Sequence, residues 1–217
     1  MGLKFKIYTT IYFLACFVSF FFIDAGTSLE EMVVKILSLV FLAFLYISVS
    51  KEINYWYILI LMCIIGSDSF FVFDPDFLTE GVILVLIERF LYFIILRKTL
   101  SKIKIVSLLT YMIPGILIFG TLLYIYLPYL KDMLGTLFVI CFFNITLISV
   151  AYLNFLQKND QKNLFFLLGI FMISAVDFLM VYNKYLDYNF YYVIGYTLTY
   201  YTARYLICYS IIEERYR

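Results

Sequence analysis

Long runs of apolar residues alternate with short polar stretches along the whole chain. Each run is long enough to cross about 30 Å of hydrocarbon, because an α-helix rises about 1.5 Å per residue. Only a few residues separate consecutive runs, so no soluble domain fits between them. The pattern predicts an all-α polytopic membrane protein, in which a bundle of eight transmembrane helices with short loops forms one integral domain over residues 1–217. The predicted spans cover residues 6–23, 32–49, 54–73, 78–96, 105–127, 133–156, 163–182 and 189–212.

The composition supports this fold class and excludes several functions. Hydrophobic residues make up 65% of the chain and charged residues 14%, whereas soluble domains contain about 45–50% and about 25%. The net charge of +1 provides no basic face, which excludes a nucleic-acid partner. The four cysteines each fall inside an apolar run, so we expect buried small side chains and no disulfides. They are Cys16, Cys63, Cys141 and Cys208.

The absence of histidine restricts the chemistry further. Mechanisms that need an imidazole base or ligand are excluded, including Ser/His intramembrane proteolysis and histidine-bearing zinc sites. The sequence shows no Cys/Asp/Glu cluster with metal-ligand spacing in their place. Any reaction must therefore use Asp, Glu, Lys, Arg, Tyr, Ser or Asn.

The lysines and arginines predict the orientation in the membrane. Of the 16 cations, 11 lie on the side of the N-terminus, and only Lys131 and Lys184 lie on the opposite side. Because positive loops stay in the cytoplasm, both termini should be cytoplasmic, as an even number of spans requires. We expect a multi-pass protein of a bacterial inner membrane. The 11 cations are Lys4, Lys6, Lys51, Arg97, Lys98, Lys102, Lys104, Lys158, Lys162, Arg215 and Arg217.

Two carboxylates lie well inside apolar runs: Asp177 in GIFMISAVDFLMVYNKY and Asp68 in IIGSDSFF. A charge at the bilayer centre costs about 2.5 kcal/mol or more, so an acid there calls for a reason. The helix directions put both acids at nearly the same depth, in one layer with Lys35 and Glu80. Two carboxyl groups in a low-dielectric site tend to have different proton affinities, so that one stays neutral and the other is ionised. This arrangement suits acid/base catalysis at a single bond. We expect both to face one cavity, with carboxyl groups within roughly 10 Å.

Other interpretations of these charges stay open. Each acid can act as hydrogen-bonding glue between helices, or join a structural ion-pair network with Glu88, Arg89 and Arg204. Paired acids also occur in proton-coupled transporters and in intramembrane aspartyl proteases. The proteases carry a GxGD motif and a later Pro-Ala-Leu, and the segments GSD and AVD here lack both.

Several segments, in the same order, resemble the YhhN family of eight-span membrane proteins. GIFMISAVDFLMVYNKY is similar to the family's G-A-x-x-F-x-x-S-D-x-x-L-A-x-x-x-F, and IIGSDSFFVF to L-L-G-D-x-x-L. GVILVLIERFLYFI resembles G-x-x-x-F-x-x-x-H-x-x-Y, with its tyrosine at Tyr92, and TYYTARYLI resembles T-Y-Y-x-A-Q-x-L-I. Lys35 falls where the family has the Lys of a Lys-Pro pair in its second span. The chain departs from the family patterns at Ile36, Arg89 and Arg204, where the family has Pro, His and Gln.

The resemblance implies a transmembrane lysoplasmalogenase, which hydrolyses the vinyl ether bond of a lysophospholipid to a fatty aldehyde and a glycerophospho-alcohol. Asp68 and Asp177 are the expected catalytic residues: one donates a proton, and the other stabilises the cation and orients water. We expect substrate contacts from Lys35, Arg89 and Arg204 as cations and from Tyr92, Tyr200 and Tyr201. The mechanism needs no cofactor or metal, and the partners are the lysophospholipid and membrane lipid. The alternative is a non-catalytic lipid- or solute-binding protein or transporter of the same fold, and a homodimer stays open.

Overall fold

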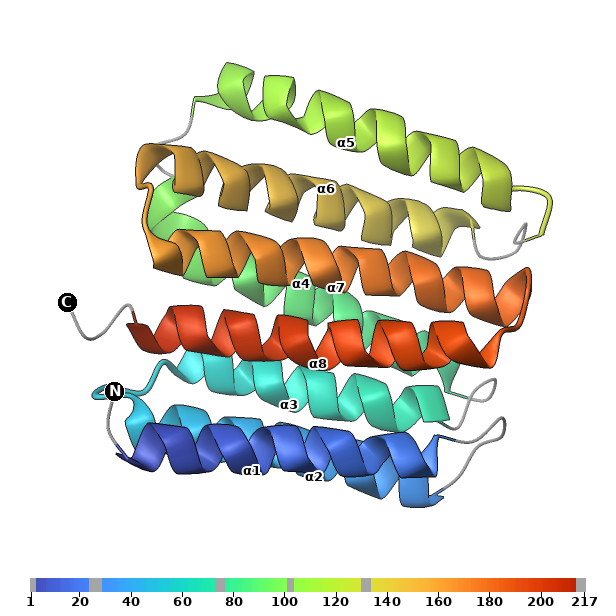
Figure 1. The fold of residues 1–217 in the computed structure, drawn as a ribbon. Coiled ribbons are helices and arrows are strands. Elements are labelled where there is room, and N and C mark those ends of the chain that lie inside the picture. The colour runs from blue at the N-terminus through green and yellow to red at the C-terminus, as the bar shows by residue number, and fades with distance from the viewer. Residues whose placement is uncertain (1–2, 24–28, 73–76, 101–103, 130–133, 214–217) are drawn as a thin grey trace. The chain divides into compact units, whose positions relative to one another are not determined.

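The computed structural model describes residues 3–23, 29–72, 77–100, 104–129 and 134–213, and eight α-helices follow one another through them (Figure 1). Apolar runs form the helices, and the turns between them are short and polar. The all-α prediction is confirmed for the described residues, and the helix ends lie within four residues of the predicted ones. The helices are α1 (Leu3–Ser19, continued by the 3-10 helix η1, Phe20–Phe22), α2 (Leu29–Val49), α3 (Tyr55–Val72), α4 (Leu78–Leu100), α5 (Ile105–Tyr126), α6 (Leu134–Gln157), α7 (Gln161–Tyr185) and α8 (Phe190–Glu213).

Five of these elements are long and apolar enough to cross a membrane, which indicates a multi-pass membrane protein. They are α1 with η1, α2, α5, α6 and α7. The described apolar stretch of α3 is shorter, α4 carries Glu80, Glu88 and Arg89, and α8 carries Arg204. The charged residues within α4 and α8 lower the mean hydropathy of these two helices.

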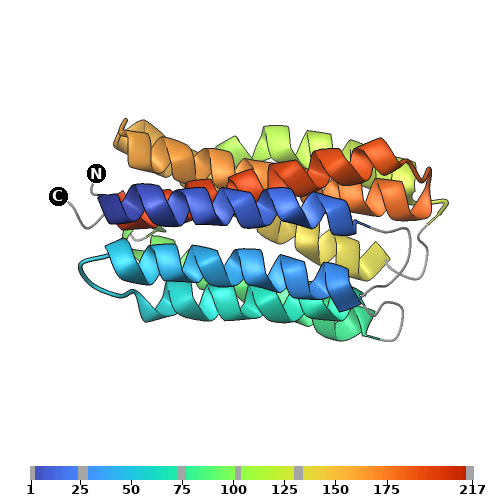
Figure 2. The same cartoon turned by 60° about the horizontal axis from the view of Figure 1, so that its bottom comes forward.

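The chain forms two compact units, Met1–Leu91 with Ile211–Arg217 and Tyr92–Ser210. In the first unit α1 packs against α2, and α2 packs against α3 (Figure 2). The turn between α2 and α3 is fastened by Tyr46, whose hydroxyl accepts a hydrogen bond from the Asn54 backbone N–H at 2.7 Å. The Tyr46 ring also meets the Tyr57 ring edge to face, with centroids 4.7 Å apart.

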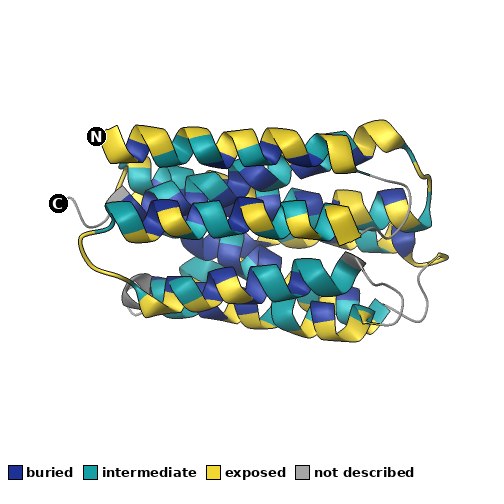
Figure 3. Cartoon of the chain, turned by 90° about the horizontal axis from the view of Figure 1, so that it is seen from below, coloured by how far each residue is buried: buried dark blue, intermediate teal, exposed yellow. Residues whose placement is uncertain are grey.

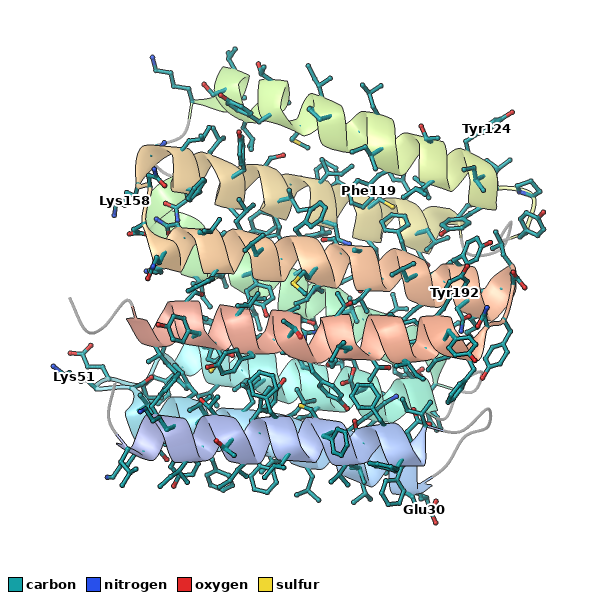
Figure 4. The ribbon with its side chains drawn as sticks, viewed as in Figure 1. Glu30, Lys51, Phe119, Tyr124, Lys158 and Tyr192 are labelled. Atoms are coloured by element: carbon teal, nitrogen blue, oxygen red, sulfur yellow. The ribbon has the colours of Figure 1, made fainter. Side chains whose placement is uncertain are left out.

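In the second unit α5 packs against α6, and α6 packs against α7. Phe119 of α5 belongs to a buried apolar cluster, and its ring centroid lies 4.7 Å from that of Phe178 on α7 (Figure 4). The Tyr126 hydroxyl donates to the Phe178 backbone carbonyl at 3.2 Å. Helix α5 continues through Pro114. These contacts fix the position of Phe178 on α7, the residue directly after Asp177.

Large apolar side chains remain exposed on the helix faces, as expected for surfaces that contact lipid (Figure 3). On α5, for example, Leu117 and Ile118 are 67% and 60% exposed. The four cysteines are buried and free, which confirms their predicted state. Several of the cations used for the predicted orientation lie outside the described residues: Lys102, Lys131, Arg215 and Arg217.

Candidate functional site

Helices α7 and α8 approach each other closely at Gly169. A Cβ atom at this position would lie 2.5 Å from the Ile207 Cγ1 atom and 3.0 Å from the Ala203 carbonyl oxygen. Real Cβ contacts are longer, so only glycine allows this separation without a shift of α8. Gly169 therefore allows polar side chains of α7 and α8 to lie in the same interior region of the second unit.

Two ring contacts define the antiparallel register of α7 and α8. Phe165 meets Tyr209 with centroids 5.3 Å apart, and Tyr182 meets Tyr192, labelled in Figure 4, with centroids 6.0 Å apart. Seventeen residues separate Phe165 from Tyr182, and seventeen separate Tyr192 from Tyr209. Asp177 precedes Tyr182 by five residues, so it lies level with the residue five positions after Tyr192, which is Thr197.

The Asp177 carboxylate is held by an amide from the neighbouring helix. Asn144 on α6 is 1% exposed, and its Nδ2 atom donates to the Asp177 Oδ2 atom at 2.9 Å. Val176 and Phe178, on either side of the acid, are buried. An interhelical hydrogen bond of this kind satisfies a polar group inside an apolar bundle and fixes its direction.

Arg204 on α8 is a buried cation with two aromatic neighbours. It is 5% exposed, and its Nη1 atom lies 3.3 Å from the Tyr92 hydroxyl oxygen, to which it donates. Its guanidinium carbon lies 4.9 Å from the centroid of the Tyr200 ring, a cation–π contact. The Tyr201 ring lies 5.6 Å from that of Tyr200. The planar guanidinium group has the donor geometry that matches a phosphate.

The second unit therefore contains five of the eight predicted site residues. They are Asp177, Tyr92, Tyr200, Tyr201 and Arg204. Arg204 follows Thr197 by seven residues, which places the cation about 10 Å along the helix axis from the level of Asp177. Acid and cation lie on facing helices of one unit.

The other three predicted site residues belong to the first unit. Asp68 is half-buried on α3. Lys35 forms an ion pair with Glu31, one turn earlier on α2. The Arg89 Nη1 atom lies 3.0 Å from Glu88 Oε1, and both side chains are buried. The predicted proximity of Asp68 to Asp177 stays a prediction, because the two acids belong to units that are each described by themselves.

Ion pairing changes the interpretation of Lys35 and Arg89. Each cation has an acid on its own helix, four positions away for Lys35 and adjacent for Arg89. A charge that already has a partner must exchange it to hold a substrate phosphate. These two substrate contacts stay predictions. The described contacts of Arg204 are to the Tyr92 hydroxyl and the Tyr200 ring.

The sequence analysis missed Asn144, although its signal is visible in the segment ICFFNITLISV. A lone amide in the middle of an apolar run needs hydrogen-bond partners on another helix. The residue it bonds, Asp177, is 33 positions away. Among the described residues, no three Cys, Asp or Glu side chains gather as a metal site.

Comparison with known proteins adds no further information on the site. The chain matches no protein-family model, no curated protein and no solved structure. The resemblance to the YhhN family therefore rests on the residues quoted above, and the function is argued from the contacts of the site.

Proposed function

We propose that the chain is a membrane hydrolase that cleaves the vinyl ether bond of a lysophospholipid. The observation that carries this proposal is the arrangement in the second unit of a carboxylate oriented by Asn144 and a buried cation, Arg204, held by Tyr92 and Tyr200. A carboxyl group can transfer a proton at the ether, and a fixed guanidinium can bind the phosphate. Acid and cation are about 10 Å apart along the axis of α8.

The separation suits a lysophospholipid with a vinyl ether. Six bonds join the first alkenyl carbon to the phosphorus atom and span about 7 Å when extended, at the per-bond reach of a backbone chain. The extended Arg204 side chain accounts for the difference between this length and the separation of acid and cation along α8. The same arrangement leaves the fatty chain to lie among the apolar side chains of the bundle, where burial of each methylene contributes about 0.8 kcal/mol.

The reaction is an acid-catalysed addition of water. A protonated Asp transfers its proton to the alkenyl carbon remote from the oxygen, which leaves an oxocarbenium ion. Water attacks the carbon bonded to oxygen and loses a proton to the other carboxylate, giving a hemiacetal. In the breakdown of the hemiacetal, its hydroxyl proton passes to the first carboxylate, and the second carboxylic acid protonates the departing glyceryl oxygen as the C–O bond breaks. The products are a fatty aldehyde and a glycerophospho-alcohol, and both carboxyl groups return to their starting protonation states. The proposal assigns these roles to Asp68 and Asp177 together.

The proposal includes the membrane arrangement. All eight helices span the bilayer, α3, α4 and α8 included, and the interior charges of α4 and α8 face protein rather than lipid. Both termini lie in the cytoplasm of a bacterial cell, as the excess of lysine and arginine on that side favours. The chain belongs in this proposal to the YhhN family, and its reaction uses no cofactor.

A second candidate is a non-catalytic binding protein of the same fold. The buried pair of Glu88 and Arg89 favours it, because mutually neutralised charges on one helix are typical of a structural network. In this candidate the second unit binds an anionic lipid through Arg204 and performs no chemistry.

Aldehyde release from a lysoplasmalogen by the purified protein in detergent or nanodiscs separates the two candidates. The control substrate is the saturated alkyl ether with the same head group, which cannot form the oxocarbenium ion by protonation. The proposal predicts release from the vinyl ether alone. Binding of both lipids with no aldehyde from either would reject the hydrolase and leave the binding protein.

A further inference from the structure

Three lysines flank the same end of the packed helices α5, α6 and α7. Lys104 directly precedes α5, Lys158 directly follows α6, and Lys162 lies in the first turn of α7. These helices are three of the five that are long and apolar enough to cross a membrane. Because such a span fills the hydrocarbon, a lysine at its end lies at the depth of the lipid head groups.

Contacts between α5 and α6 put Lys104 beside the turn that joins α6 to α7. The Ser149 Oγ atom donates to the Tyr111 carbonyl oxygen at 3.2 Å, and a Cβ atom at Gly115 would lie 3.0 Å from the Ile145 side chain. The two helices are therefore antiparallel. Lys104 precedes Tyr111 by seven residues, so it lies level with the last residues of α6, seven positions after Ser149. Packed helices lie about 8–10 Å apart, so Lys104 is about one helix spacing from the turn.

The turn between α6 and α7 is fastened by the buried side chain of Asn163, which is 4% exposed. Its Oδ1 atom accepts a hydrogen bond from Asn154 Nδ2 at 2.8 Å, and its Nδ2 atom donates to the Lys158 carbonyl oxygen at 3.0 Å. The Asp160 backbone N–H donates to the same carbonyl at 2.8 Å. The backbone that carries Lys158 is thus fixed before a ligand binds, which lowers the entropy cost of binding.

Positive charge exceeds negative charge at this end of the second unit. Lys104 and Lys158, which is labelled in Figure 4, are exposed, and Lys162 is half-buried. The acid at this end, within the described part of the unit, is Asp160. Its carboxylate accepts the Asn163 backbone N–H at 2.9 Å and caps the start of α7. The three ammonium groups therefore provide a net positive surface at head-group depth.

We propose that Lys104, Lys158 and Lys162 form a binding site for the head group of an anionic two-chain phospholipid. The inference goes beyond the proposed function, because this lipid is bound and not cleaved. Lysine binds a phosphate as a point charge and so needs no exact geometry of the ligand. A zwitterionic lipid also carries a phosphate, but the cation of its own head group offsets that charge, so the site favours an anionic lipid.

Lipid binding to the purified protein in detergent, counted by native mass spectrometry, tests the site. The two ligands are phosphatidylglycerol and phosphatidylcholine with the same acyl chains. We expect Lys158→Gln to weaken phosphatidylglycerol binding about fivefold, the factor that corresponds to about 1 kcal/mol for one lysine, and to leave phosphatidylcholine binding unchanged. Lys104→Gln, Lys158→Gln and Lys162→Gln together should weaken the tightest phosphatidylglycerol binding at least tenfold.

Lys184→Gln is the matched control, because it removes the same charge from the last turn of α7, at the opposite end of the unit. It should leave phosphatidylglycerol binding at the wild-type value, and inorganic phosphate in molar excess over the lipid should not displace the bound lipid. Unchanged phosphatidylglycerol binding in the triple variant, an equal loss in Lys184→Gln, or displacement by inorganic phosphate would overturn the site. Aldehyde release does not enter this measurement, so failure of the hydrolase proposal leaves the lipid site standing, and the reverse also holds.

Discussion

The hydrogen bond between Asn144 and Asp177 should be a measurable part of the stability of the second unit. The bond is 2.9 Å long, and the donor residue is 1% exposed, so water does not compete effectively for it. Hydrogen bonds between membrane helices average about 0.6 kcal/mol and reach about 1.7 kcal/mol. Because one partner is a carboxylate, which forms the stronger bonds, we expect a value near the upper end, about 1–2 kcal/mol.

A double-mutant cycle isolates this contribution. Asn144→Leu and Asp177→Leu each replace a polar side chain by an apolar one of similar size, and the double variant removes both partners. The assay is reversible unfolding in mixed detergent micelles, followed by circular dichroism. Asn144→Leu should destabilise the protein, because the carboxylate loses a donor. The double variant should recover about 1–2 kcal/mol relative to the sum of the single changes. Additivity within about 0.3 kcal/mol would refute the view that Asn144 holds the acid.

Three further predictions concern packing, ligand binding and topology. Gly169→Leu should destabilise the protein by about 1–3 kcal/mol in the same unfolding assay, because its Cβ would overlap Ile207, whereas Gly120→Leu, with nothing within 4 Å of its Cβ, should be near neutral. Arg204→Lys should weaken binding of an alkyl-ether lysophospholipid about tenfold, because an ammonium loses the fork geometry and the stacking on Tyr200, and unchanged affinity would reject the phosphate contact. Thiol labelling of single cysteines placed in a background without native cysteines should mark positions 4 and 158 from the cytoplasm and position 184 from the other side, and labelling of all three from one side would reject the eight-span arrangement.

The helices could be predicted from the sequence because each one is a long apolar run between short polar turns. The burial of Cys16 and Cys141 and the continuation of α5 through Pro114 followed from the same pattern. A membrane helix needs little more information than this, because every backbone group is satisfied within the helix and the lipid accepts any apolar face.

The pairing of the interior side chains could be predicted only where the partners are close in sequence. Glu31 and Lys35 stand four positions apart, the spacing at which helical side chains meet, so this ion pair was open to prediction. Asn144 and Asp177 are 33 positions apart, and Tyr92 and Arg204 are 112 apart. Helices that are apolar on all sides give no sign of which face points inward, so the rotation of α6, α7 and α8 could not be derived from hydrophobic periodicity.

The central claim is that Asp177 and Asp68 perform acid/base chemistry rather than structural bonding. Asp→Asn tests it directly, because an amide keeps the shape and can still accept the Asn144 bond, but it neither donates a carboxylic proton nor carries negative charge. The measurement is aldehyde release from a lysoplasmalogen by the wild type, Asp68→Asn and Asp177→Asn, with unfolding recorded for each. We predict release by the wild type, a loss of at least a hundredfold in each variant, the scale of general acid catalysis, and stability within about 1 kcal/mol of the wild type. Full activity in either variant, or destabilised variants of a wild type that releases no aldehyde, would contradict the claim.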